Sequence, residues 1–194
     1  MYAYIDGKLT HKNPTYVVIE TAGVGYLIHI SLHTYGKLTH HEHCKLFTWL
    51  YVREDAHLLY GFIDEAERKL FLHLISVSGI GANTARMMLS SLTPEEIQQA
   101  IVNGDATTIQ RIKGIGAKSA QRLILELQDK LKKEDTTFSS GESSINTVQE
   151  EALSALVMLG FVKNQAEKVL QKILKENNKL LSVEELIKLS LKNL

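Results

Sequence analysis

The chain has 194 residues, of which 44% are hydrophobic and 23% charged, and its formal net charge at pH 7 is zero. This composition is typical of a globular protein of one to three small domains, without the overall basic field of many nucleic-acid-binding proteins. No apolar run approaches the roughly 20 residues that span a bilayer, and the first residues lack a signal-peptide pattern. The single cysteine, Cys44, fits a reducing compartment. We therefore expect a cytoplasmic protein with no membrane contact.

Residues 1–63 are predicted to form a small β-barrel. Short alternating runs rich in valine and tyrosine indicate about five strands, which lie in the opening YAYIDGKL and at 16–20, 26–30, 45–53 and 57–62. Strands this short and closely spaced fit a closed or partly open barrel of the oligonucleotide/oligosaccharide-binding (OB) type.

Residues 64–133 are predicted to be all helical, because the apolar period changes at Asp64 from strand-like to helix-like. Thr93 and Glu96 have the spacing of a capping box around Pro94, which marks a helix start. Within this segment one template occurs twice, thirty-five residues apart, as SGIGANTAR and KGIGAKSAQ. The repeat predicts two similar helix–turn–helix units.

The glycine pair in each copy is predicted to form a tight connection that approaches an anion. Glycine permits positive φ and lets backbone amides reach a ligand with no Cβ in the way. The isoleucine between the glycines is expected to anchor the turn in the core. Thr84 and Ser119 are expected to cap the second helix of each copy, whose free amides and dipole favour a phosphate.

A nucleotide is an alternative source of that phosphate, but the spacing argues against it. A P-loop needs four residues between its first glycine and a contiguous Gly-Lys-Ser/Thr, whereas Ala117 separates Gly116 from Lys118. Ser119 stands where the Rossmann pattern requires its third glycine. The sequence therefore does not predict an ATPase.

The tandem template resembles the helix-hairpin-helix family, which grips DNA phosphates through the minor groove without reading sequence. A purely structural pair of hairpins is the alternative. Charge favours DNA, because residues 110–133 carry seven basic and two acidic side chains, a local net charge of +5. The predicted DNA-binding residues are Gly79, Gly81, Asn83, Thr84, Gly114, Gly116, Lys118, Ser119 and Arg122.

The last third of the chain is predicted to be a linker and a small helical domain. Residues 134–147 are serine-rich and too polar to offset the entropy of ordering, so we expect a flexible linker. Residues 148–194 are predicted to form a three-helix bundle that serves as a docking module. Its helices are expected at about 148–159, 164–176 and 182–193.

The turn between the last two predicted strands carries two carboxylates, Glu54 and Asp55. Taken alone they indicate only a turn, where acidic residues are common. The whole order of segments is more specific. A small barrel containing VGY (24–26) and a REDAHLLYGF hairpin, two hairpin motifs, an acidic linker and a three-helix tail resembles the RuvA family of Holliday-junction-binding proteins along essentially the whole chain.

That resemblance implies a multidomain α+β protein that binds four-way DNA junctions as a homotetramer, one or two per junction, in recombination, DNA repair and the SOS response. It implies that Glu54 and Asp55 form an acidic pin that repels phosphates at the crossover. It also implies that 148–194 binds a RuvB-type hexameric ATPase, that a RuvC-type resolvase is a further candidate partner, and that the chain itself has no catalytic residue and no cofactor.

Some positions depart from the family pattern, and two other functions are alternatives. Relatives often carry proline and lysine where this chain has Ala82 and Asn83, and a second lysine at Ala117. A DNA repair enzyme built on the same hairpins is one alternative, but no active-site signature accompanies them. A DNA-binding adaptor is another, since ALVMLGF resembles a ubiquitin-associated unit. The THHEHC run (39–44) suggests a metal site, but a solvated loop is favoured, since consecutive histidines point to different faces.

Overall fold

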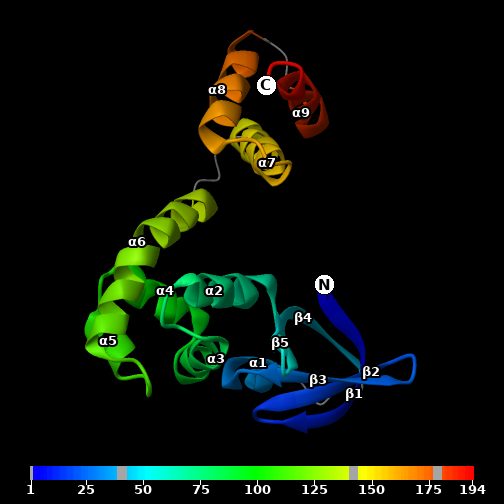
Figure 1. Ribbon diagram of the computed structural model, residues 1–194, viewed down its shortest axis with the longest axis vertical. Coiled ribbons are helices and arrows are strands. Elements are labelled where there is room, and N and C mark those ends of the chain that lie inside the picture. The colour runs from blue at the N-terminus through cyan, green and yellow to red at the C-terminus, as the bar shows by residue number, and fades with distance from the viewer. Residues whose placement is uncertain (1, 39–42, 140–143, 177–180) are drawn as a thin grey trace. The chain divides into compact units, whose positions relative to one another are not determined.

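The computed structural model describes residues 2–38, 43–139, 144–176 and 181–194 (Figure 1). The chain divides into two compact units, Met1–Thr137 and Phe138–Leu194. The described residues of the first unit form a closed five-stranded barrel followed by helices, and those from residue 144 onward in the second unit form three helices. The predicted multidomain α+β fold is therefore confirmed. None of the described helices is long and apolar enough to cross a membrane.

The barrel is built from five strands in the order β1-β2-β3-β5-β4 and closes through pairing of β1 with β4. All neighbouring pairs are antiparallel except β3 and β5, which are parallel. Alternating apolar side chains fill the interior, as the period of the strands predicts. The strands are β1 (Tyr4–Asn13), β2 (Tyr16–Thr21), β3 (Val24–Ile30), β4 (His43–Val52) and β5 (His57–Phe62).

Two positions in the barrel depend on special backbone or space requirements. The β2–β3 connection turns through Ala22 and Gly23, whose φ values are 50° and 82°, as a two-residue hairpin requires. Gly61 on β5 leaves no room for a side chain, because a Cβ there would overlap the Ile28 side chain. A short helix that the sequence did not predict, α1 (Leu32–Lys37), follows β3, and Ser31 caps it by accepting a hydrogen bond from the Thr34 amide.

The helical part of the first unit packs on the barrel through one continuous core. Tyr60 and Phe62 of β5 belong to the same buried cluster as Phe71 and the apolar residues of the helices. The predicted capping box is present, with Thr93 and Glu96 each bonded to the other's backbone amide. The helices are α2 (Glu65–Ser76), α3 (Ala82–Ser91), α4 (Pro94–Val102), α5 (Ala106–Gln110) and α6 (Ala117–Ser139).

Helix covers much of the segment predicted to be a linker. Helix α6 continues through 134–139, and α7 (Ser144–Met158) begins before the predicted end of the linker, while 140–143 lie outside the described residues. Helices α8 (Lys163–Glu176) and α9 (Val183–Leu191) complete the second unit. Gly160, two residues after the end of α7, adopts a positive φ of 99°, as glycines that end helices commonly do. The three helices enclose a small core of Ala152, Leu156, Ala166, Leu170, Ile173 and Leu186.

Candidate nucleic-acid interface

The two glycine loops have nearly the same backbone geometry. Gly79 and Gly114 both have a φ of 92°, which only glycine adopts without strain. The isoleucine amides at 80 and 115 donate to the carbonyls three residues earlier, over 3.0 and 3.1 Å. Both isoleucines are buried, with 5% of their surface exposed. The sequence repeat is therefore also a structural repeat, anchored in the core as predicted.

Each loop leads into a helix, and the glycine directly before that helix is exposed. Gly81 caps α3 without a side-chain hydrogen bond, and the Ala85 amide donates to its carbonyl over 2.9 Å. In the second motif the Ala120 amide donates to the Gly116 carbonyl over 3.0 Å. The first amides of such a helix, together with its dipole, form a site that attracts an anion.

The expectation that Thr84 and Ser119 cap these helices is wrong. Helix α3 begins at Ala82 and α6 at Ala117, so both hydroxyl residues lie inside the first helical turn. The physical reason is that the exposed Gly81 and Gly116 occupy the capping positions. With no capping side chain at Gly81, the space in front of the α3 amides stays open to a ligand.

The two motifs differ in charge at equivalent positions. In the second motif Lys118 is exposed, and Arg122 is half-exposed while its Nε donates to the Glu126 carboxylate over 2.7 Å. In the first motif the matching residues are uncharged. The Asn83 side chain is exposed, and its Oδ1 accepts a hydrogen bond of 3.3 Å from the Tyr60 hydroxyl. The sequence did not show this link, because Tyr60 and Asn83 lie in different segments.

Arg86 of α3 faces the barrel instead of the open side of the hairpin. Its guanidinium donates to the Thr15 carbonyl over 3.1 Å and lies 3.4 Å from the His29 Nδ1. Burial, and secondarily the Arg86 charge, lowers the pKa of His29, so the neutral ring that accepts this bond is favoured. The His29 ring also lies 5.7 Å from the Tyr60 ring. This polar cluster joins the first hairpin motif to the barrel, and sequence reasoning missed it.

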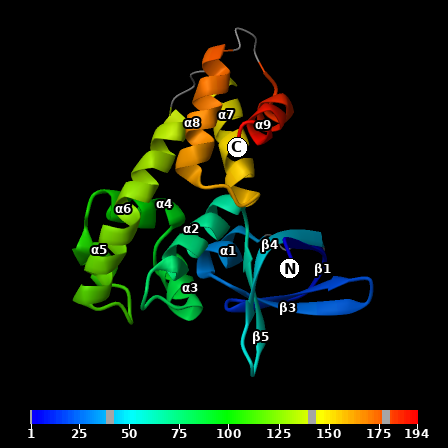
Figure 2. The same cartoon turned by 45° about the horizontal axis from the view of Figure 1, so that its top comes forward.

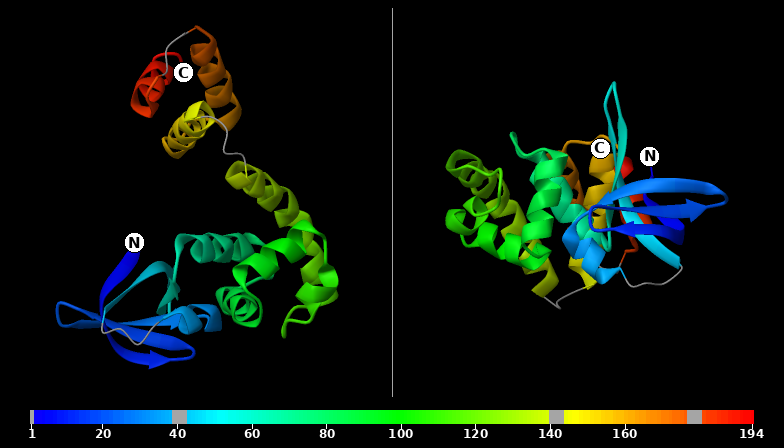
Figure 3. Two further views of the ribbon diagram at one scale, coloured as in Figure 1. Left: turned by 180° about the vertical axis from the view of Figure 1, so that it is seen from behind. Right: turned by 90° about the horizontal axis from the view of Figure 1, so that it is seen from below.

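The acidic turn stands at the end of a long hairpin formed by β4 and β5. The strands pair from Phe47 and Phe62 out to Val52 and His57, and the Arg53 amide closes the turn on the Ala56 carbonyl over 2.8 Å. Glu54 and Asp55 are both exposed at this tip. Figures 2 and 3 show that the tip projects beyond the barrel, and that the two glycine loops lie on the same side of the unit.

A ladder of aromatic rings supports the hairpin from inside. Trp49 stacks on Tyr51 with ring centroids 5.3 Å apart, and it also lies 5.4 Å from Phe71 of α2. The Tyr60 ring lies 5.5 Å from the same Phe71 ring. Offset aromatic contacts of this kind hold the strands against the helical core. The acidic tip is thus the outer end of an element whose inner end is packed.

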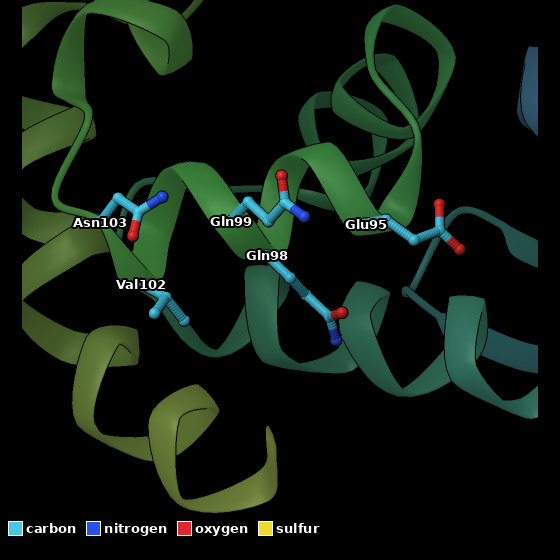
Figure 4. Close-up of a pocket in the computed structure, with 5 residues that line it drawn as sticks. All are labelled: Glu95, Gln98, Gln99, Val102 and Asn103. Carbon is cyan, nitrogen blue, oxygen red and sulfur yellow. The ribbon is translucent and has the colours of Figure 1, made fainter. Parts of the chain in front are cut away.

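Two shallow cavities lie elsewhere on the described surface, and neither is lined by a residue of the glycine loops. A shallow cavity of about 240 Å³ follows α4, and Figure 4 shows that polar side chains and one valine line it: Glu95, Gln98, Gln99, Val102 and Asn103. It lies away from both glycine loops. Within the described ranges no group of three or more His, Cys, Asp or Glu side chains could hold a metal ion. Residues 39–42 of the histidine-rich run lie outside those ranges.

Comparisons with known proteins agree with this arrangement. Residues 1–61 match the family model for the RuvA N terminal domain, 71–129 the SAM-like helix-hairpin-helix tandem, and 147–194 the RuvA C-terminal domain. Proteins named Holliday junction branch migration complex subunit RuvA are similar over the full length. One from Cytophaga hutchinsonii is 50% identical over 99% of both chains, and one from Christiangramia forsetii is 53% identical over 100% of both. Because the match runs from end to end at about half of all positions, the chain belongs to the RuvA family.

Proposed function

We propose that this protein binds four-way (Holliday) DNA junctions without reading sequence, and that it holds them open for branch migration. One observation carries the proposal: two equivalent glycine loops and an exposed carboxylate tip lie on the same side of one compact unit (Figure 2). Paired hairpins suit two phosphates along one DNA arm. The tip suits the centre of the junction, where strands part and no duplex passes.

The roles of the individual residues follow from this arrangement. The loops of Gly79 to Gly81 and Gly114 to Gly116 give backbone amides to phosphates, together with the first residues of the following helices, Asn83, Thr84, Lys118 and Ser119. Lys118 and Arg122 add charge. Glu54 and Asp55 form the acidic pin. One tetramer would place four pins at the centre of the junction, and two tetramers would place eight.

The second unit is proposed to load a hexameric RuvB-type ATPase, with a RuvC-type resolvase as a further candidate partner. Its surface supports docking, because four apolar side chains around the α7–α8 connection are exposed: Val157, Met158, Leu159 and Val162. Met158 has 86% of its surface exposed, and such clusters mark interaction sites. We also propose that the chain has four functional segments: the barrel with its hairpin (1–63), the DNA-binding helices (64–133), a connecting segment (134–147) and the docking domain (148–194).

The protein itself is proposed to be non-catalytic, without a cofactor, and to act in the cytoplasm in DNA recombination and repair. A repair enzyme on the same scaffold would need an active site beside the hairpins. The tandem motifs of this chain lack the P-loop spacing. Their loop amides and polar side chains are all assigned to phosphate contacts in this proposal. A pure adaptor would not need the loops and the pin.

The deciding experiment is a gel-shift comparison of a four-way junction with a linear duplex of the same arm sequence. We expect a clear preference for the junction. Removing residues 144–194 should keep that preference and abolish stimulation of a RuvB-type ATPase on junction DNA, and Met158→Lys in the full chain should do the same. Equal affinity for both DNAs would contradict junction binding, and intrinsic ATP hydrolysis would contradict a non-catalytic subunit.

A further inference from the structure

One buried carboxylate joins the barrel to the hairpin motifs and has no part in the proposed DNA contacts. Glu67 lies in the first turn of α2 and has none of its surface exposed. The donors to its carboxylate are neutral. Ser31 Oγ donates to Oε1 over 2.6 Å, and Oε2 accepts from Thr34 Oγ1 over 2.7 Å and from the Ile63 amide over 3.0 Å.

A buried carboxylate is costly unless its hydrogen bonds are made with good geometry. Each donor to Glu67 is itself fixed. Ser31 caps α1, Thr34 lies inside α1, and Ile63 directly follows β5. The Glu67 amide in turn donates to the Asp64 carboxylate over 2.8 Å, which caps α2. The site therefore admits only a narrow range of arrangements of α1, the end of β5 and α2.

These elements are the ones that relate the acidic tip to the first glycine loop. Helix α2 leads into the loop of Gly79, and β5 leads from the tip to Ile63. Glu67 stands where the two meet. The other polar links between barrel and motif are less buried: the Leu32 amide donates to Ser90 Oγ over 3.1 Å at an exposed position, and the Arg86–His29 and Tyr60–Asn83 contacts are only part-buried.

Because the hairpin is long, a small change of angle near Glu67 moves the acidic tip by a large distance. Roughly 8 residues separate the tip from Ile63, which at about 3.3 Å per residue is a lever of roughly 26 Å. Because β5 is paired with β3 and β4, barrel and hairpin move as one body, and a rotation of this body by about 10° about Ile63 would displace the tip by about 5 Å. That distance is half the Debye length of about 10 Å at 0.1 M salt, so the repulsion between the tip and a phosphate would change substantially.

We propose that Glu67 is a positioning residue that fixes the acidic tip relative to the glycine loops and thereby sets selectivity for junction over duplex DNA. The proposal rests on the proposed junction binding. A merely structural role would lower stability and leave the selectivity of the folded protein unchanged. A positioning role changes selectivity in a protein that is still folded.

The test compares Glu67→Gln, which keeps size and removes charge, with wild type. Glu185→Gln is a matched control, because Glu185 is an exposed glutamate at the same place in a capped helix of the second unit. Dissociation constants for a four-way junction and a linear duplex are measured at one salt concentration, after cooperative unfolding has been verified. We expect the ratio of duplex to junction constants to fall about threefold or more in Glu67→Gln and to stay constant in Glu185→Gln.

A double-mutant cycle then asks whether Glu67 acts through the tip. In a Glu54→Gln, Asp55→Asn background, Glu67→Gln should cause no further fall in the ratio. The proposal is overturned if Glu67→Gln weakens both DNAs equally, or if the two effects on the ratio simply add. If Glu67→Gln does not fold, Thr34→Val, which removes one donor, takes its place with the same expected direction. A wild type without junction preference would instead overturn the proposed function itself.

Discussion

Asn83 and Lys118 occupy the same place in the two hairpin motifs, each as the second residue of the helix that follows the glycine loop. One turn later, Met87 in the first motif matches Arg122 in the second. The cationic positions of the second motif are thus neutral in the first. Since both loops have the same backbone geometry, we infer that the motifs differ in how their DNA contacts respond to salt.

Removing both cations of the second motif should flatten the salt dependence of junction binding. Each phosphate contact contributes about −0.9 to the slope of log K against log salt, so Lys118→Ala with Arg122→Ala should reduce the slope by up to about 1.8 per subunit. Binding titrations over a series of salt concentrations measure it. Asn83→Ala with Met87→Ala is the control, and its slope should equal that of wild type. An unchanged slope without Lys118 and Arg122 would place the cationic face elsewhere.

Introducing the missing cation into the first motif should have the opposite effect. Asn83 is exposed at the start of α3, so Asn83→Lys should tighten junction binding and steepen the salt slope by about 0.9 per subunit. A lysine near a helix N-terminus also lowers stability by about 0.3–1 kcal/mol, and thermal unfolding of the free protein checks this cost. A steeper slope for duplex only would mean that the first motif does not contact the junction.

Neutralising the tip should weaken selectivity. Glu54→Gln with Asp55→Asn is expected to increase duplex binding more than junction binding, because a duplex across the centre passes the carboxylates and an open junction does not. A carboxylate about 7 Å from a phosphate is repelled by roughly 0.6 kcal/mol in water, and by more where partly desolvated. The ratio of the two dissociation constants at fixed salt is the measurement. Glu20→Gln, at the β2–β3 end of the barrel, controls for overall charge, and equal rises for both DNAs would refute the pin.

Because Gly79 has a positive φ, replacing it with a residue that carries a side chain should destabilise the protein. Gly79→Ala forces an L-residue to a φ of 92° and should lower the free energy of unfolding by about 1–2 kcal/mol. Gly36→Ala is the contrasting variant, since Gly36 lies in α1 with open space around it and no positive φ. It should raise stability by about 0.5–1 kcal/mol. Urea unfolding of both variants checks the opposite signs.

His29 should make stability depend on pH. Its pKa in the folded protein is lowered from 6.5, so below pH 6.5 the unfolded chain binds a proton that the folded chain does not. The stabilisation is complete above pH 6.5 and is lost as the pH falls from 6.5 towards the lowered pKa. His29→Asn keeps an acceptor for Arg86 and removes the titration. The loss of stability between about pH 7.5 and about pH 5.5 should therefore be smaller in His29→Asn than in wild type.

The sequence predicted the elements whose signals are local and periodic. The five strands, the two glycine turns and the Thr93 capping box all depend on residues a few positions apart. Helix α1 was missed because it has only six residues, LHTYGK, with a glycine inside and no amphipathic period. The caps were misassigned because a hydroxyl side chain is the commoner helix cap, while these glycines serve both the turn and the cap.

The links that orient the site could not be predicted, because they join segments far apart in the chain. Glu67 is thirty-six residues from Ser31, and Arg86 is seventy-one residues from Thr15. In the sequence Glu67 is one of two glutamates in the first turn of an amphipathic helix, directly after the capping Asp64. Only the packed structure shows that this carboxylate, and not Glu65, points into the protein.

The way β5 is held has a mechanical consequence. Its residues bond to β4 on one side and to β3 on the other, and its inner end is packed against Phe71. A force along the hairpin, such as DNA would exert on the tip while being moved, loads these hydrogen bonds in shear, where many must fail together. Peeling, in which bonds break one at a time, would need a force directed away from the barrel. The tip can therefore resist a sliding load with little deflection, although it ends in a turn of only a few residues.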